Sequence, residues 1–258
     1  MATAGSNSFQ KMRIALSLMG HGRAATLLEQ VRRQAMSEEL CYGFRRDLAE
    51  AFTPPPSLIP IRLRPFETRD RQGLFDDTPR IGQDGKSMLD RLRRLSYLDA
   101  GMPTPYVAVT DDGTPCFIQW LMTAGSNDFI GSYFDGYFPR LAEDEVMVEG
   151  VFIPEQFRGK RIMAAAMSQL AMRGGELGAR FATTYTQSTD LPAIRGCLAA
   201  GFRPQVKRVA RWRRFVREMR FSPLTPDERR EVETRGDIPS SGSTAPRDQR
   251  RLPRPGKE

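Results

Sequence analysis

Residues 146–161, Val-Met-Val-Glu-Gly-Val-Phe-Ile-Pro-Glu-Gln-Phe-Arg-Gly-Lys-Arg, join an apolar strand to a basic turn. The apolar segment that follows, about residues 162–177, predicts a buried helix. The first amide N–H groups of a helix have no partner within it, and the helix dipole adds positive potential there. Gly159 lets the backbone approach a ligand closely. With three basic side chains in the turn, this strand–turn–helix unit favours a diphosphate ligand.

Several other classes of site are excluded. The dinucleotide pattern GxGxxG and the ATP-binding pattern GxxxxGK[ST] are absent. The chain has one histidine, His21, which argues against a histidine-based zinc site and against a Ser-His-Asp triad. The three cysteines, Cys41, Cys116 and Cys197, are widely spaced and odd in number, which favours a reducing compartment.

The 258-residue chain carries a formal net charge of +8, and 40% of its residues are apolar. This balance allows a sizeable core and indicates an anionic partner: a phosphate-bearing cofactor, nucleic acid or an anionic membrane surface. No apolar run approaches the roughly 20 residues that span a bilayer. We therefore expect a cytoplasmic protein without a transmembrane segment.

The flanking sequence predicts three parts. Residues 8–36 have helical periodicity, and the Pro-rich segment 53–57 interrupts regular structure, so residues 1–57 are predicted to be a helical extension and linker. The helical extension either packs on the domain or lies on a membrane surface or partner. Residues 58–221 are predicted to form the main domain. Residues 222–258, rich in Pro, Ser, Gly and charge, predict a disordered tail.

Within the main domain, most elements follow from local patterns. We expect a strand near 59–66, a helix over 86–101, a hairpin around Asp111-Asp112-Gly113, a strand over 180–186, a short helix over 190–200, and one or two strands over 205–217. Residues 124–143, rich in glycine and aromatic residues, are interpreted as an insertion or loop near a pocket.

The basic turn resembles the pyrophosphate loop of the GNAT acetyltransferase superfamily, [RQ]-x-x-G-x-[GA]. Gln156 and Gly159 match that pattern, and Arg161 stands where a small residue is usual. Residues 190–202 resemble the closing motif N-x-x-A-x-x-x-Y-x-x-x-G-F, with Asp190 in place of Asn and Cys197 in place of Tyr. The resemblance covers about residues 59–217.

This resemblance implies an α/β (α+β) fold: a mixed, mostly antiparallel sheet flanked by helices on both faces, with its fourth and fifth strands splayed to form a cleft. Acetyl-coenzyme A is the implied cosubstrate, a primary amine is the acceptor, and no metal is involved. The implied cofactor-binding residues are Val151, Phe152 and Ile153 along the strand, then Gln156, Arg158, Gly159, Lys160, Arg161, Ile162 and Met163, with Asp190 from the closing motif. Asp190 also suits a helix cap.

Acyl transfer needs a base for the amine and a proton donor for the departing thiolate. Glu149 is the first candidate base, because a carboxylate in an apolar strand is costly without a task or a partner. Glu145 is the second candidate. Cys197 and Tyr185 are candidate acids, although the sequence favours a small, buried helix residue as the interpretation of Cys197 and a coenzyme A thiolate can leave without an acid. A strand N–H near Phe152 is the candidate oxyanion donor.

Tyr133 and Tyr137 are candidate lining residues of the acceptor pocket, and core packing is the alternative for both. Two rival functions stay open: a catalytically silent acyl-CoA-binding module, and a basic protein associated with RNA or a membrane surface. Nucleic acid is a partner that the sequence allows but does not favour, and a homodimer also stays open.

Overall fold

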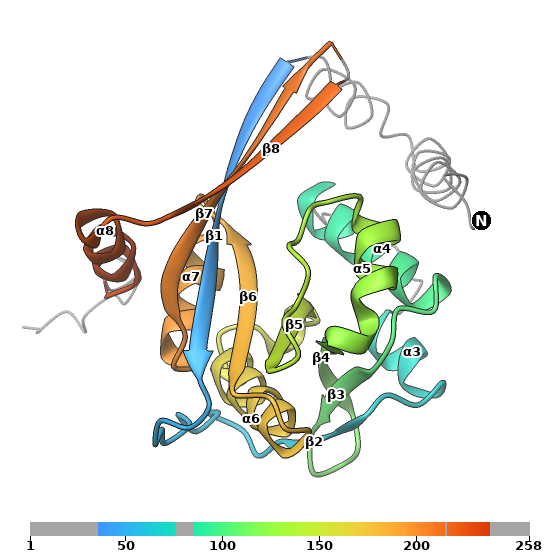
Figure 1. Cartoon of the computed structure of the whole chain (residues 1–258). Helices are drawn as coiled ribbons and strands as arrows, with labels where there is room; N and C mark the ends of the chain where they lie inside the picture. The colour runs from blue at the N-terminus through green and yellow to red at the C-terminus, as the bar shows by residue number, and fades with distance from the viewer. Residues whose placement is uncertain (1–35, 76–84, 215, 238–258) are drawn as a thin grey trace, which may run out of the picture.

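One eight-stranded sheet organises the part of the chain that the computed structural model describes, residues 36–75, 85–214 and 216–237 (Figure 1). The strands are β1 (Met36–Asp47), β2 (Arg62–Pro65), β3 (Pro105–Val109), β4 (Pro115–Thr123), β5 (Glu145–Phe152), β6 (Phe181–Gln187), β7 (Arg203–Arg213) and β8 (Val216–Pro223). The helices are α3 (Asp70–Leu74), α4 (Gly85–Asp99), α5 (Asn127–Phe134), α6 (Ile162–Glu176), α7 (Leu191–Ala199) and α8 (Pro226–Asp237), with short 3₁₀ turns η1 (Ala124–Ser126) and η2 (Glu155–Phe157).

The strand order is β2-β3-β4-β5-β6-β1-β7-β8, and every neighbouring pair is antiparallel except β5–β6. That parallel pair is short, because only Glu145–Met147 of β5 pair with Phe181–Thr183 of β6. Beyond those residues the two strands diverge, as Figure 1 shows. We call this region the fork: residues 148–153 after the paired part of β5, and residues 184–187 of β6. The predicted mixed sheet with splayed central strands is confirmed.

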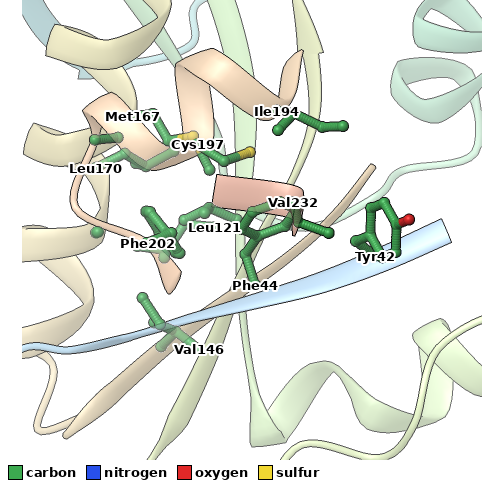
Figure 2. Packing of buried hydrophobic residues seen from close by; sticks show 14 of the residues in the cluster. Tyr42, Phe44, Leu121, Val146, Met167, Leu170, Ile194, Cys197, Phe202 and Val232 are labelled. Carbon is green, nitrogen blue, oxygen red and sulfur yellow. The ribbon is translucent and has the colours of Figure 1, made fainter. Parts of the chain in front are cut away.

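Helices cover both faces of the sheet. On one face, α6, α7 and α8 pack over a core cluster that includes Phe44, Leu121 and Phe202 (Figure 2). On the other face, α3, α4 and α5 pack over a second cluster that includes Trp120, Ile130 and Met147. Phe152 and Tyr185 of the fork belong to this second cluster.

The prediction of a helical extension over residues 1–57 is wrong for Met36–Asp47, which forms β1 in the interior of the sheet between β6 and β7. Tyr42 and Phe44 point into the helix-covered core, whereas Cys41 and Gly43 alternate with them on the opposite face. Alternation with a period of two is typical of a strand. It was missed because the apolar residues of the preceding segment recur at the three- and four-residue steps that predict a helix. The predicted helical residues 8–35 lie outside the described part of the chain.

The prediction of a disordered tail is wrong for Pro226–Asp237, which forms α8. Val232 is buried in the main core, and Gly236 lies so close to Leu198 of α7 that no larger side chain fits there without a shift. Thr225 and Glu228 bond reciprocally at the start of the helix, which satisfies two amides. Residues 238–258 lie outside the described residues.

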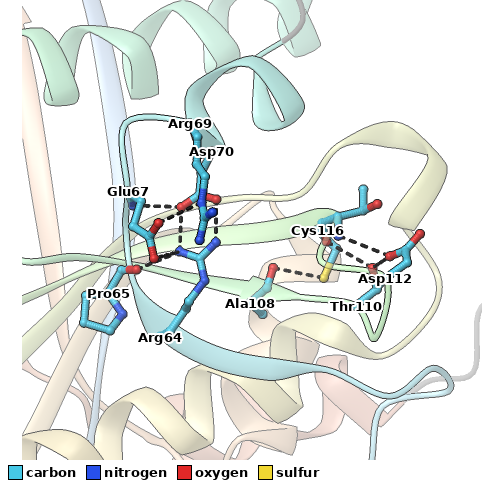
Figure 3. A network of polar contacts seen from close by, with 10 residues as sticks. Arg64, Pro65, Glu67, Arg69, Asp70, Ala108, Thr110, Asp112 and Cys116 are labelled. Atoms are coloured by element: carbon cyan, nitrogen blue, oxygen red, sulfur yellow. Dashed lines mark hydrogen bonds and ion pairs between the residues drawn. The ribbon is translucent and has the colours of Figure 1, made fainter.

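Polar contacts fix the far edge of the sheet (Figure 3). Arg64 of β2 makes a two-pronged ion pair with buried Asp70 of α3, with N–O distances of 2.6 and 2.7 Å. The arginine opposite it lowers the pKa of Asp70, against the effect of burial. In the predicted hairpin β3–β4, Asp112 accepts from Thr110 and from the Thr114 N–H. These contacts stabilise the β2 edge of the sheet, and none of them involves a residue of the fork.

Candidate active site at the fork

The basic turn between β5 and α6 lies beside the fork and is exposed at Arg158, Gly159 and Arg161. Gly159 has a φ of +76°, a conformation that glycine adopts without a steric penalty. Among the described residues, no side chain caps the start of α6. The first-turn amides of this helix therefore have no side-chain acceptor from that part of the chain, which is the arrangement that suits an anion.

Arg161 occupies the N-cap position of α6 with a φ of +57° and a ψ of +19°. This left-handed conformation costs a residue with a Cβ roughly 1–2 kcal/mol. The same geometry explains why a small residue is usual at this position of the resembling pattern. Arg161 nevertheless adopts this strained conformation, and its side chain is exposed at the start of α6.

The start of α7 is built differently. Asp190 is the N-cap residue, and its Oδ1 accepts from the Ala193 N–H over 3.1 Å, with Pro192 in the first turn. The capping role of Asp190 is confirmed. A contact between Asp190 and a cofactor stays a prediction.

A β-bulge marks the β5 side of the fork. Trp120 of β4 pairs with Glu149, yet Ile118 pairs with Phe152, so Gly150 and Val151 together oppose one residue. Gly150 has a φ of +81°, and a Cβ there would lie 2.9 Å from the Trp120 ring. Only glycine fits this position without strain. The bulge bends β5 immediately after the candidate base.

Glu149 reaches across the fork. Its Oε2 accepts the backbone N–H of Tyr185 on β6 over 3.3 Å, two residues beyond the last backbone pair of the two strands. A carboxylate thus satisfies an amide at the point where strand pairing has stopped. This contact places the first candidate base, Glu149, next to the candidate acid Tyr185 in a single site.

Burial raises the pKa of Glu149 above its ordinary value of 4.5. The Arg94 guanidinium opposes that shift most strongly, followed by the backbone N–H groups of Gly150 and Tyr185 and then by Arg208. A buried carboxyl group with a raised pKa is a stronger proton acceptor once ionised than an exposed one.

Two arginines bond to backbone carbonyls along the strand where a cofactor is expected. Arg94 Nε of α4 donates to the Val151 carbonyl over 3.3 Å, and Arg158 Nε donates to the Ile153 carbonyl over the same distance. Phe152 between them pairs with Ile118, and its ring stacks on Phe75 with centroids 5.0 Å apart. The strand therefore offers carbonyl acceptors on the side of the fork, and guanidinium groups occupy them in this structure.

The order β2-β3-β4-β5-β6, the brief parallel pairing of β5 with β6, the bulge and the uncapped helix start after β5 together decide the fold. The chain has the GNAT fold.

No protein-family model matches the chain, and no curated protein matches it. Solved structures with a similar arrangement include a functionally unknown conserved protein from Staphylococcus epidermidis, at 13% identity and a TM-score of 0.42 over 71% of this chain and 65% of that one. A GNAT-family acetyltransferase from Colwellia psychrerythraea matches at 13% and 0.42, over 73% and 62% of the two chains. A GCN5-related N-acetyltransferase from Sphaerobacter thermophilus matches at 14% and 0.40, over 79% and 58%. The chain spans less than two thirds of the length of each of these structures.

Cys197, which stands where the GNAT closing motif has Tyr, lies on α7 inside the core cluster and is 1% exposed (Figure 2). Burial raises the pKa of this thiol far above its ordinary range. The structure thus supports the small, buried interpretation of Cys197. Burial also raises the pKa of Tyr185, to about 12, but its backbone contact with Glu149 keeps this residue in the fork.

Glu145 lies at the closed end of β5, where the strand still pairs with β6. Its carboxylate forms a 3.0 Å ion pair with Arg45 and accepts the Ala142 N–H. Both contacts hold the start of the strand. The structure separates this second candidate base from Glu149 by four residues of extended chain.

The two candidate acceptor residues have different surroundings. Tyr133 of α5 stacks on Phe129 and shares a 3.1 Å hydrogen bond with Ser96 of α4, so it packs between helices. Tyr137, after α5, donates its hydroxyl to Glu39 of β1 over 2.9 Å and lies beneath the Arg208 guanidinium. Tyr137 therefore lies with Arg208, whose guanidinium also faces Tyr185 of the fork, whereas Tyr133 packs among aromatic residues between α4 and α5.

The sequence did not predict four residues of this site: Glu39, Gly43, Arg94 and Arg208. The structure explains why position 43 is a glycine, because a Cβ there would lie 2.7 Å from the Tyr185 ring. Arg208 sits in an arginine-rich run whose mixed period conceals which side chains turn inward. The alternation of β7, once paired with β1 in the register Cys41–Arg208, is the signal that places it.

Among residues 36–75, 85–214 and 216–237, no cluster of three histidine, cysteine or acidic side chains is arranged to hold a metal ion. The three cysteines are buried free thiols. Within the same residues, the structure has no helix whose length and apolar character would let it cross a membrane.

Proposed function

We propose that the protein is an N-acyltransferase that moves an acetyl or other short acyl group from coenzyme A to a primary amine by direct attack in a ternary complex. The observation that carries this proposal is the partly buried Glu149 carboxyl group, which lies at the fork of a GNAT fold and accepts the Tyr185 N–H across it. The exposed turn and uncapped helix beside it provide the second requirement, a place for the diphosphate.

In the proposed reaction, the uncharged amine attacks the thioester carbonyl. A nitrogen–carbon bond forms, the carbon–sulfur bond breaks, and the electron pair leaves with the coenzyme A sulfur. Glu149 accepts the proton that the amine loses, directly or through a water molecule. Backbone N–H groups at the bulge near Phe152 are the proposed donors to the developing oxyanion.

The proton donor for the thiolate differs from the one the family pattern suggests. We propose that Cys197 does not serve, because its thiol is enclosed in the core. Tyr185 is the hydroxyl-bearing residue of the fork, and a coenzyme A thiolate is also stable enough to leave without a dedicated acid.

Coenzyme A would bind with its pantetheine along residues 151–153 and its diphosphate at the amides of 159–163. Arg94 and Arg158 occupy the Val151 and Ile153 carbonyls in this structure, so binding requires these guanidinium groups to yield to pantetheine amides. Arg158 is an exposed residue of the turn, and its guanidinium, which contacts Glu155 and Ser87 in this structure, can pair with a phosphate instead.

A second candidate is an acyl-CoA-binding module without catalysis. The buried Cys197 and the strained Arg161 favour it, because both depart from the family pattern at positions that serve the cofactor in that pattern. Cytoplasmic location, a homodimer and RNA association stay predictions.

Thiol release from acetyl-CoA, measured over a panel of primary amines with and without Glu149→Gln, tests the proposal. An enzyme shows amine-dependent release that the variant loses while both proteins bind acetyl-CoA equally in calorimetry. Binding without amine-dependent release by the wild type would establish the silent module, and absence of binding to any acyl-CoA would overturn both functions.

A further inference from the structure

A buried arginine without a carboxylate partner lies on the side of the fork opposite β5. Arg208 of β7 is 4% exposed. Its two terminal nitrogens donate to the Tyr137 carbonyl over 2.7 Å and to the Cys41 sulfur over 2.9 Å. Its Nε is buried and has no hydrogen-bond partner. Among the described residues, no carboxylate oxygen comes within 4.0 Å of the guanidinium.

The groups around Arg208 do not neutralise it. Three aromatic rings surround the guanidinium, with centroids 4.2 Å (Tyr137), 5.4 Å (Phe138) and 5.6 Å (Tyr185) away. Burial raises the pKa of the Cys41 thiol to about 11, so the sulfur that Arg208 contacts is uncharged at neutral pH. The direct hydrogen-bond partners of Arg208 are neutral, although Glu39 and Glu149 lie further away. A buried cation without a direct anionic partner is costly, and an anion that reaches it relieves that cost.

The nearest acidic group on β1 is already engaged. Glu39 accepts the Tyr137 hydroxyl and the side-chain amide of Gln187 over 2.7 Å. These bonds hold Glu39 against Tyr137 and leave the Arg208 guanidinium to a ligand.

Arg208 and Glu149 flank the same residue. The Tyr185 ring faces the guanidinium, and the Tyr185 backbone N–H bonds to the carboxyl group of Glu149. Arg208 is also close enough to Glu149 to lower its pKa. A cation and a proton acceptor thus both contact Tyr185, one at its ring and one at its backbone, with no ion pair joining them in this structure.

Arg46 provides an internal contrast. It too is 4% exposed and contacts neutral groups, the Ser168 hydroxyl at 2.8 Å and the Ala200 carbonyl at 3.0 Å. These partners belong to the face of the sheet that α6 and α7 cover, and the two helices enclose Arg46 there. Arg46 therefore clamps the core, whereas Arg208 lies on the face that carries Tyr185 and the fork.

From this geometry we infer that the acceptor is a small amino acid, whose carboxylate binds Arg208 while its amine is presented to Glu149. The inference rests on the proposed acyltransferase function and names its substrate class. A guanidinium is suited to this task because it stays charged when buried and matches the planar geometry of a carboxylate.

The test compares acceptors that differ only in the carboxylate: leucine, leucinamide and isopentylamine, with the corresponding glycine and glutamate series. We expect the wild type to favour the amino acid over its amide by about 10- to 100-fold in kcat/KM, the range for a hydrogen bond to a charged group. Arg208→Gln should bring that ratio towards one through a higher KM for the amino acid, and Arg208→Lys should keep part of it. Arg46→Gln, the matched control, should keep the wild-type ratio.

Equal rates of the wild type with amino acids and their amides would overturn the inference and leave the acyltransferase intact. This comparison needs no variant, so it decides the matter even where Arg208→Gln does not fold. Absence of transfer to every amine would overturn the proposed function. In that case a saturable rise in Tm with leucine, seen in the wild type and weakened in Arg208→Lys, still supports an amino-acid site, and no rise with any amino acid removes it.

Discussion

Strand β5 carries two glutamates four residues apart, and its two ends give them different environments. Glu145 lies where β6 still pairs with the strand, and it forms an ion pair with Arg45 near the surface. Glu149 lies where β6 has turned away, and its partner is a backbone N–H left unpaired by that divergence. The divergence of the two strands, rather than the residue type, therefore distinguishes a structural carboxylate from a candidate catalytic one.

Replacing each glutamate by glutamine tests whether the two carboxylates contribute differently to acyl transfer. Glu149→Gln should lower kcat/KM for acyl transfer by about 10²- to 10⁴-fold, the usual contribution of a general base. Glu145→Gln should leave transfer close to the wild-type rate, because its carboxylate holds the strand start. Steady-state kinetics with a saturating amine measures both, and equal losses would show that the fork has no special role.

The pH dependence of activity also distinguishes the two glutamates, because a different arginine lies near each of them. Arg94 lowers the pKa of Glu149, so Arg94→Gln should raise that pKa and move the acid limb of the kcat/KM profile to higher pH. Arg45→Gln, which removes the partner of Glu145, should not move it. A profile unchanged by Arg94→Gln would mean that another group controls the acid limb.

Stability should respond to pH in the opposite sense to that of an ordinary paired carboxylate. The folded protein binds the Glu149 proton more tightly than the unfolded chain, so this group's contribution is fully present below pH 4.5 and is lost as pH rises through the raised pKa. Glu149→Gln should therefore gain Tm relative to the wild type as pH rises above 4.5. Calorimetric scans across that range measure the difference, and parallel curves would place the carboxyl group in a more hydrated site.

The two helix starts offer a second test at smaller scale. Asp190→Ala removes the cap of α7 and should cost about 1 kcal/mol of stability with no change in acetyl-CoA affinity. Arg161→Gly should do the reverse, relieving roughly 1 kcal/mol of left-handed strain while removing a charge near the diphosphate and weakening cofactor binding. Denaturant unfolding and calorimetry separate the two quantities. Loss of affinity in Asp190→Ala would instead indicate a direct contact between Asp190 and the cofactor.

The smallest expected effect belongs to the Arg45–Glu145 pair, which is partly exposed. Breaking it with Arg45→Gln should cost about 0–1 kcal/mol, as is typical of such pairs. High salt should reduce the cost. A larger loss in urea unfolding would show that this contact governs the parallel pairing of β5 with β6.

Much of the fold was predictable because its signals are local. The hairpin β3–β4 follows from an Asp-Gly turn between apolar strands, and α7 follows from Asp190 and Pro192 before an apolar stretch. The turn before α6 was also predicted, together with its glycine. The position of β1 was not, because a strand that joins the middle of the sheet is recognised by partners on β6 and β7, more than 130 residues away along the chain.

The sequence by itself determined the strand–turn–helix unit at 146–177 and placed Glu149 on an apolar strand, because turn chemistry and side-chain periodicity act between near neighbours. Only the tertiary structure decided what surrounds that glutamate. Tyr185 meets it from β6, Arg94 from α4 and Arg208 from β7, and the two strands part to bury it between them. Burial and charge depend on groups brought together in space, which is why the surroundings of Glu149 had to come from the fold.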